Sequence, residues 1–339
     1  MAARLADLGP VTVLDAAAPA AGASGAAAGL VNPFAGQRAA PGWRYEEALA
    51  ALTEMVDRAG TPHLLRQPGL LRPARGARQI RDFRDRAAEY PDELTWWSAS
   101  AARERWPDVR VDDGALWVAR GGVVDLPALV HALLATAEVD SGVHVTGIGE
   151  NGQEAFVETD THGRLAASRV VLAPGDGFRA FPPLAALPLG RLKGQTIRAR
   201  PLERLDVPLL AGHGYAVPED DGRIVLGSTY EHDFADPAPD EAASRAILEQ
   251  ACRMIPALDG ATVEDARAGV RVTVPSSLSP RRLPRIGPIG NGRIWALIGL
   301  GSKGLLTAPL LARDLPAWFD DPAGVHPDVG IRIGDGSRT

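Results

Sequence analysis

The sequence has one cysteine, almost no lysine and no long apolar run. A lone Cys252 cannot form a disulfide within the chain, which indicates a reducing compartment such as the cytoplasm. No apolar stretch approaches the ~20 residues of a membrane span. The first nine residues lack the apolar core of a signal peptide. These absences disfavour a secreted disulfide-rich domain and a membrane-spanning protein.

The chain also lacks the common signatures of metal and nucleophilic sites. Its seven histidines are scattered without metal-ligand spacing, so we predict no metal site. It has no HExxH, no GxxxxGK[ST] and no Ser-His-Asp order. Its net charge of −6 disfavours broad binding to nucleic acid or anionic lipid. Its 339 residues suit two domains, or one large α/β domain with an inserted second domain.

Strand and helix patterns alternate along the chain, which is typical of an α/β fold. Val11–Leu14 predicts a buried strand that ends in Asp15, and Arg169–Ala173 predicts an apolar strand that stops at Pro174-Gly175. Glu150–Gly152 has the composition of a hairpin turn between two strands.

Helices are indicated by their spacing and caps. Asp125 is suited to cap a helix that runs to about Ala137. Pro239–Ile255 has helical spacing, and we expect Cys252 to pack in or near this helix without a chemical role.

Small residues follow the first predicted strand. An acidic residue at a strand end, here Asp15, binds the adenosine ribose in dinucleotide-binding units, although it is more often a turn former. Gly22-Ala23-Ser24-Gly25 lies just downstream, where backbone approaches a phosphate or ring closely. The alternative is an Ala/Gly-rich loop in a composition-biased chain.

A second glycine-rich segment, Gly299–Gly304, lies between a predicted strand at Ile294–Ile298 and a helix at Leu305–Phe319. Its amides and the helix start would favour an anionic or electron-rich ligand. Lys303, one of two lysines, is either part of this site or a solvated side chain.

Two further residues are candidates for substrate contact. Arg271 lies in an apolar run, where it either binds a substrate carboxylate or pairs with an internal acid. Tyr215, one of four tyrosines, either lies in the core or points its hydroxyl into a pocket.

Taken in order, these segments resemble the D-amino-acid oxidase family of FAD-dependent oxidoreductases, which includes glycine oxidase, sarcosine oxidase and the oxidase domain of a tRNA wobble-uridine-modifying enzyme. The resemblance covers nearly the whole chain. The matching runs are 11–15, 22–29, 121–125, 170–175, 193–195, 214–218, 227–229, 269–271, 283–287 and 299–309.

The resemblance implies a Rossmann-like FAD-binding domain at residues 1–65, 121–175 and 281–325. It implies a substrate domain with an inserted antiparallel sheet at 66–120 and 176–280, followed by a tail at 326–339. FAD would be bound non-covalently, because Cys252 lies away from the flavin motifs and no histidine stands in the 22–29 loop.

The resemblance also assigns roles to single residues. Asp15 would bind the adenosine ribose, Arg271 the substrate carboxylate, and Tyr215 would face the substrate. The remaining cofactor-binding residues would be Ser24, Gly25, Gly29, Val145, Gly175, Gly301, Ser302, Lys303, Gly304 and Leu305. A small amine or amino acid would pass a hydride to flavin N5, its imine would hydrolyse, and oxygen or another acceptor would reoxidise the flavin.

One departure concerns the start of the chain. Members of the family open with a strand and GxGxxG, whereas Ala2–Leu8 reads as the end of the helix that follows them. We expect a start placed too far downstream, which extending the reading frame upstream would test.

Two other functions stay open. Gly227–Tyr230 and Gly301–Ala308 are similar to the tRNA-modifying oxidase domain, which would make tRNA a partner. A flavin-free product without enzymatic activity is the third hypothesis.

Overall fold

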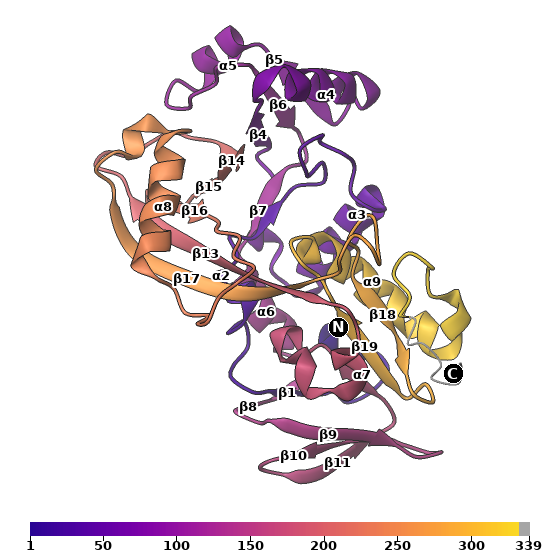
Figure 1. The fold of residues 1–339 in the computed structure, drawn as a ribbon. Helices are drawn as coiled ribbons and strands as arrows, with labels where there is room; N and C mark the ends of the chain where they lie inside the picture. The colour runs from indigo at the N-terminus through magenta and orange to yellow at the C-terminus, as the bar shows by residue number, and fades with distance from the viewer. Residues whose placement is uncertain (332–339) are drawn as a thin grey trace. The chain divides into compact units, whose positions relative to one another are not determined.

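The computed structural model describes residues 1–331, and these residues form two compact units (Figure 1). The first unit contains Met1–Ala23, Val130–Leu192 and the chain from Val270 onward. The second unit contains Ser24–Leu129 and Lys193–Gly269. Each unit therefore combines segments that are distant in the sequence, as the discontinuous α/β architecture requires.

The first unit carries three small sheets. In the first, β1 (Thr12–Asp15) pairs in parallel with β8 (Glu138–Ser141). In the second, β12 (Val170–Leu172) pairs in parallel with β19 (Ile294–Ile298), and β19 pairs antiparallel with β18 (Arg285–Ile289). All five residues of β19 are buried, so the core of this unit forms around it.

The third sheet of this unit is an antiparallel meander of β9 (Val145–Glu150), β10 (Ala155–Thr159) and β11 (Gly163–Ala167). The hairpin predicted at Glu150–Gly152 is confirmed, because the Asn151 N–H donates to the Glu154 carbonyl at 2.9 Å.

The prediction of a buried first strand is wrong. Thr12 is exposed and the rest of β1 is half-buried. Within residues 1–331 β1 has one strand neighbour, β8, and β12 has one, β19. A strand with one paired edge is only partly covered, and an apolar β-branched run does not reveal how many neighbours it has.

The first unit also contains α9 (Gly304–Asp320), which begins one residue before the predicted helix. Smaller helical segments are α1 (Ala2–Leu5), η2 (Gly175–Ala180), α7 (Pro182–Ala185) and η4 (Pro322–Gly324). The predicted tail 326–339 is described only as far as residue 331, where Ile331 N–H donates to the Ile286 carbonyl at 2.9 Å. The rest of it lies outside the described residues.

The second unit contains most of an eight-stranded sheet. Two long strands of this sheet, β13 and β17, each include residues assigned to both units. The sheet order is β17 (Thr262–Thr273), β13 (Gly190–Arg200), β16 (Ile224–Gly227), β15 (Gly214–Pro218), β14 (Leu209–Gly212), β4 (Leu70–Pro73), β6 (Ala115–Val118) and β5 (Leu94–Trp97). A separate small sheet has the order β2 (Leu30–Val31), β7 (Gly122–Val124) and β3 (Leu65–Arg66).

Helices cover this sheet. The helix α8 (Glu241–Cys252) packs against β15 and β16 (Figure 1) and buries Ile247 and Ala251 in the core. Cys252 is half-buried at its end, and burial raises the pKa of its thiol. The other helical segments of this part of the chain are α2 (Ala23–Ala26), α3 (Tyr45–Arg58), η1 (Pro62–Leu64), α4 (Gly76–Glu89), α5 (Ala99–Arg105), α6 (Leu126–Leu134) and η3 (Pro256–Leu258).

The cap predicted at Asp125 is confirmed, since its carboxylate accepts the Ala128 N–H at 3.1 Å. The helix that it caps, α6, ends at Leu134, earlier than predicted.

Candidate functional site

The glycine-rich turn Gly299–Gly304 connects the buried strand β19 to α9. Gly299 and Gly301 have φ of +78° and +53°, conformations that L side chains rarely adopt. A Cβ on Gly299 would lie 2.6 Å from the Val274 side chain, so the turn also needs glycine for packing. Its three glycines have GxGxxG spacing between a strand and a helix, a signal that the sequence reading did not use.

This turn presents donors and positive charge. The first amides of the 17-residue helix α9, including those of Gly304 and Leu305, have no acceptor within the helix. Lys303 precedes them, and its ammonium group donates to the Arg281 carbonyl. Burial lowers the pKa of Lys303, and Arg282 and Arg281 lower it further. An electron-rich or anionic ring edge fits this donor set, as the pyrimidine side of a flavin requires.

Arg271 lies on the strand that supports this turn. The Gly301 N–H donates to the Val272 carbonyl at 2.9 Å, and Thr273 bridges to Leu300. The structure thus brings the backbone of half-buried Arg271 next to the Gly301–Leu305 segment within the first unit. Exposed Ser302 is part of the same turn.

Asp15 lies at the end of β1, near the start of β9. One of its carboxylate oxygens accepts the Ala17 N–H at 2.9 Å, so Asp15 does form the turn that follows the strand. Its carbonyl accepts the Val143 N–H at 3.1 Å, two residues before Val145. These contacts bring Asp15 and the β9 segment together.

Gly175 is an exposed residue with φ of +54° that begins η2. The next residue, Asp176, makes two hydrogen bonds of 2.6 Å with Arg191. This ion pair fixes the segment that follows β12.

The other predicted cofactor residues lie in the second unit. Ser24 is exposed and Gly25 is half-buried, both in the four-residue helix α2. Gly29 is buried with φ of +68°, and a Cβ there would lie 1.9 Å from the Val124 carbonyl oxygen. Close packing against β7 alone therefore requires glycine at position 29.

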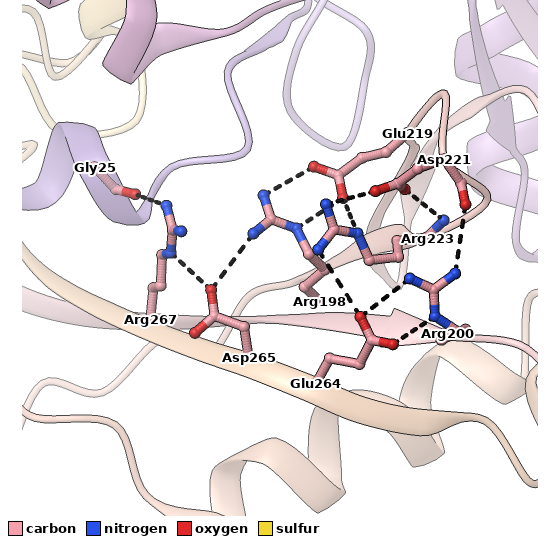
Figure 2. Close-up of polar contacts among 9 residues, drawn as sticks. All are labelled: Gly25, Arg198, Arg200, Glu219, Asp221, Arg223, Glu264, Asp265 and Arg267. Atoms are coloured by element: carbon pink, nitrogen blue, oxygen red, sulfur yellow. Dashed lines mark hydrogen bonds and ion pairs between the residues drawn. The ribbon is translucent and has the colours of Figure 1, made fainter.

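Figure 2 shows a cluster of arginines and carboxylates on β13, β17 and the β15–β16 turn that reaches Gly25. Arg198 makes two hydrogen bonds of 2.7 and 2.8 Å with Glu219, and Arg267 donates to Asp265 at 2.9 Å and to the Gly25 carbonyl at 3.4 Å. The other members are Arg200, Asp221, Arg223 and Glu264. Four arginines balance four carboxylates, so we assign the cluster to holding strands together rather than to a ligand.

Tyr215 packs against the hydrophobic core of the second unit and also lines a small hollow there, so both predicted alternatives stay open. Its ring lies against Gly227, where a Cβ would be 2.6 Å from the tyrosine oxygen. The other lining residues are His213, Ser228, Ile247, Gln250 and Ala251. The sequence reading singled out none of these, because nothing in their spacing links a hairpin to a helix some 35 residues later.

The predicted site residues are thus distributed over both units, and each unit brings some of them close together. Within residues 1–331 no group of three or more His, Cys, Asp or Glu side chains is arranged to hold a metal ion. No helix in the same range is long and apolar enough to cross a membrane.

Comparison with known proteins relates this architecture to flavoenzymes. A family model described as FAD dependent oxidoreductase (DAO) matches residues 1–318. Glycine oxidase of Pseudomonas putida is 35% identical over 244 residues, 64% of this chain and 64% of that protein. The tRNA 5-methylaminomethyl-2-thiouridine biosynthesis bifunctional protein MnmC of Pseudomonas aeruginosa is 28% identical over 289 residues, 74% of this chain and 43% of that protein. This chain spans less than two thirds of the length of either relative.

Solved structures show the same fold. Glycine oxidase from Geobacillus kaustophilus superposes with a TM-score of 0.83 at 20% identity, covering 98% of this chain and 94% of that one. Iminodiacetate oxidase from Chelativorans has a TM-score of 0.79 at 23% identity, covering 98% and 96%. With the family match over residues 1–318, these findings show that the chain belongs to the DAO family of FAD-dependent oxidoreductases.

Proposed function

We propose that this FAD-dependent oxidoreductase oxidises the C–N bond of a small amine or amino acid. The observation that carries the proposal is the joining of the Arg271 strand to the Gly299–Leu305 turn by the Gly301–Val272 hydrogen bond. A cation suited to a carboxylate and a turn suited to an electron-rich ring are thereby built on adjoining backbone.

FAD, when bound, supplies the two-electron acceptor for this oxidation. Asp15 and Val145 would serve its adenosine end. Exposed Ser24 and half-buried Gly25, with Gly29 and Gly175, would serve the remainder. The Gly301–Leu305 turn would serve the ring. This division assigns 1–65, 121–175 and 281–325 to the cofactor and 66–120 and 176–280 to the substrate.

The chain's own residues would act by positioning and electrostatics. Arg271 would hold the substrate carboxylate, and Tyr215 would present its ring and hydroxyl to the substrate. Lys303 and the first amides of α9 would favour the negative charge that accompanies reduction. No strong protein base is needed when the amine is uncharged, because Cα would lose its hydrogen as a hydride to the flavin while the nitrogen lone pair forms the C=N bond. Water would then hydrolyse the resulting imine.

Steady-state oxidation of glycine, sarcosine and iminodiacetate by the FAD-loaded protein tests the proposal. We expect formation of a carbonyl product with at least one of them, with oxygen or an added dye as electron acceptor. If no carbonyl product forms from these three substrates or from other small amines, the proposed function is wrong. A cytoplasmic location is also proposed, and the single cysteine supports it.

The second candidate function is oxidation of a modified uridine in tRNA. The observation that favours it is the 28% identity to the tRNA-modifying bifunctional protein over 289 residues. A gel-shift assay with tRNA at moderate salt discriminates the two, because a small-molecule oxidase gives no retarded band. Family membership gives no support to the flavin-free, non-enzymatic alternative.

A further inference from the structure

The loop between β17 and β18 carries two adjacent arginines, Arg281 and Arg282, that the proposed function does not use. Both side chains are exposed. Lys303, the residue before α9, contacts this loop, because its ammonium group donates to the Arg281 carbonyl. All three residues belong to the first unit. The loop therefore brings three cationic side chains to one place.

A partly buried frame fixes the shape of this loop. The Pro275 carbonyl accepts the N–H groups of Leu278 and Ser279 at 3.1 and 3.0 Å. Ser279 is only 5% exposed, and its carbonyl accepts the Arg282 N–H at 2.7 Å. The Ser279 hydroxyl accepts the Leu283 N–H at 3.1 Å. These consecutive turns hold the backbone at the two arginines, so their guanidinium groups extend from a fixed support.

The backbone of Arg282 is unusual. Its φ of +49° lies in the left-handed region, which residues other than glycine, asparagine and aspartate seldom adopt. The Arg282 side chain is exposed, so burial in a core does not account for a large residue at this position. Non-glycine residues held in this conformation are more frequent at ligand sites than elsewhere. Arg282 therefore suggests a role for its guanidinium group in binding.

The charges at this loop are of one sign. Among residues 1–331, no carboxylate forms an ion pair with Arg281, Arg282 or Lys303. Burial lowers the pKa of Lys303, and repulsion by Arg282 and Arg281 lowers it further. The cluster of Figure 2 differs, because four carboxylates balance its four arginines. The loop thus has an unbalanced positive potential on a chain whose net charge is −6.

We propose that Arg281, Arg282 and Lys303 form a binding site for a phosphate group. A guanidinium group donates two parallel hydrogen bonds to phosphate oxygens. A phosphate close to a dianion also gains more from three cations than a carboxylate with a single charge does. The phosphate belongs to a small phosphorylated ligand or to the backbone of a nucleic acid, and the tests below separate these sources. Binding at this loop does not require that the protein oxidise an amine.

Pyrophosphate is the probe, and isothermal titration calorimetry of the FAD-loaded full chain at constant ionic strength is the readout. Flavin absorbance confirms that FAD stays bound. We expect saturable binding of pyrophosphate and none of acetate. Arg281→Gln combined with Arg282→Gln should weaken pyrophosphate binding at least tenfold. Arg78→Gln combined with Arg81→Gln removes two exposed arginines of α4 in the second unit, and this charge-matched control should leave binding unchanged.

Absence of saturable binding, or equal affinity in wild type and the variant that lacks both loop arginines, would overturn the proposal. Thermal unfolding checks that each variant is folded. If the double glutamine variant unfolds, Arg281→Gln combined with Arg282→Gly removes the same charges and suits the left-handed φ of position 282.

Fluorescence anisotropy with an oligouridylate of about 20 nucleotides identifies the source of the phosphate. If a nucleic-acid backbone is the ligand, the oligonucleotide binds, and the slope of log K against log salt becomes shallower by about 1.4 when both arginines are replaced, about 0.7 for each lost phosphate contact. Bound pyrophosphate with an unchanged slope, or with no oligonucleotide binding, identifies a small phosphorylated ligand. An inactive wild type that still binds pyrophosphate would refute the proposed function and leave this site standing.

Discussion

Replacing Gln195 by leucine tests whether the buried amide holds α8 to the sheet. Leucine has nearly the same volume, so the substitution removes hydrogen bonds without opening a cavity. Three side-chain bonds are lost, to the Asp240 N–H, the Asp240 carbonyl and the Ser244 hydroxyl.

The magnitude follows from these bonds. Each contributes about 0.5–1.5 kcal/mol, giving a range of about 1.5–4.5 kcal/mol for the three. Asp240 is exposed, so water replaces part of what is lost there. We therefore expect the free energy of unfolding to fall by about 2 kcal/mol, the lower end of the range.

Urea unfolding followed by tryptophan fluorescence measures this change, with Gln153→Leu as the control. Gln153 is exposed, and its replacement should change the free energy of unfolding by less than about 0.5 kcal/mol. Equal stabilities of Gln195→Leu and wild type would refute the reasoning, because they would show that the buried amide bonds do not hold the helix.

Three further predictions concern the two units. Arg271→Met should raise KM for a carboxylate substrate at least tenfold and leave KM for an amine without a carboxylate unchanged; steady-state kinetics with matched substrates decide this. Burial, Arg75 and Arg253 hold the pKa of His213 below its ordinary value of 6.5, so the unfolded chain binds the proton first and stability falls as pH drops below about 7; the Tm of His213→Asn should fall less than that of wild type as pH is lowered, and an equal fall would contradict the lowered pKa. Gly29→Ala should lower the free energy of unfolding by more than about 2 kcal/mol, because its Cβ would lie 1.9 Å from the Val124 carbonyl oxygen. Gly36→Ala, with φ of +74° and open space around it, should lower it by only about 1 kcal/mol. Chemical unfolding of both variants measures this difference.

Local patterns in the sequence predict the local elements well. The helical spacing of Pro239–Ile255 corresponds to α8, which Asp240 caps by accepting the Ala243 N–H at 2.7 Å. The glycine-rich segment after Ile294–Ile298 connects β19 to α9 as expected. These features depend on residues within a few positions of one another, and their signals are therefore visible in the sequence.

Strand exposure and long-range side-chain partners depend on which strands are neighbours, and local sequence patterns do not reveal this. Among residues 1–331 the one strand partner of β1 is β8, which lies more than 120 residues later, and the exposure of β1 follows from this. His213 is one of seven scattered histidines in the sequence, and only the fold places it beside Arg75 and in the same hollow as Gln250. Gln195 and Asp240 are 45 positions apart, and only strand packing makes them partners. Sequence spacing has no signal for such pairs.

Anaerobic mixing of the FAD-loaded protein with candidate substrates shows whether this flavoenzyme oxidises small amines. We expect glycine, sarcosine or another small amine to bleach the visible absorption of the oxidised flavin in a single turnover, and Arg271→Met to slow this bleaching at low concentrations of a carboxylate substrate. Bound FAD that stays oxidised with every small amine would contradict the account.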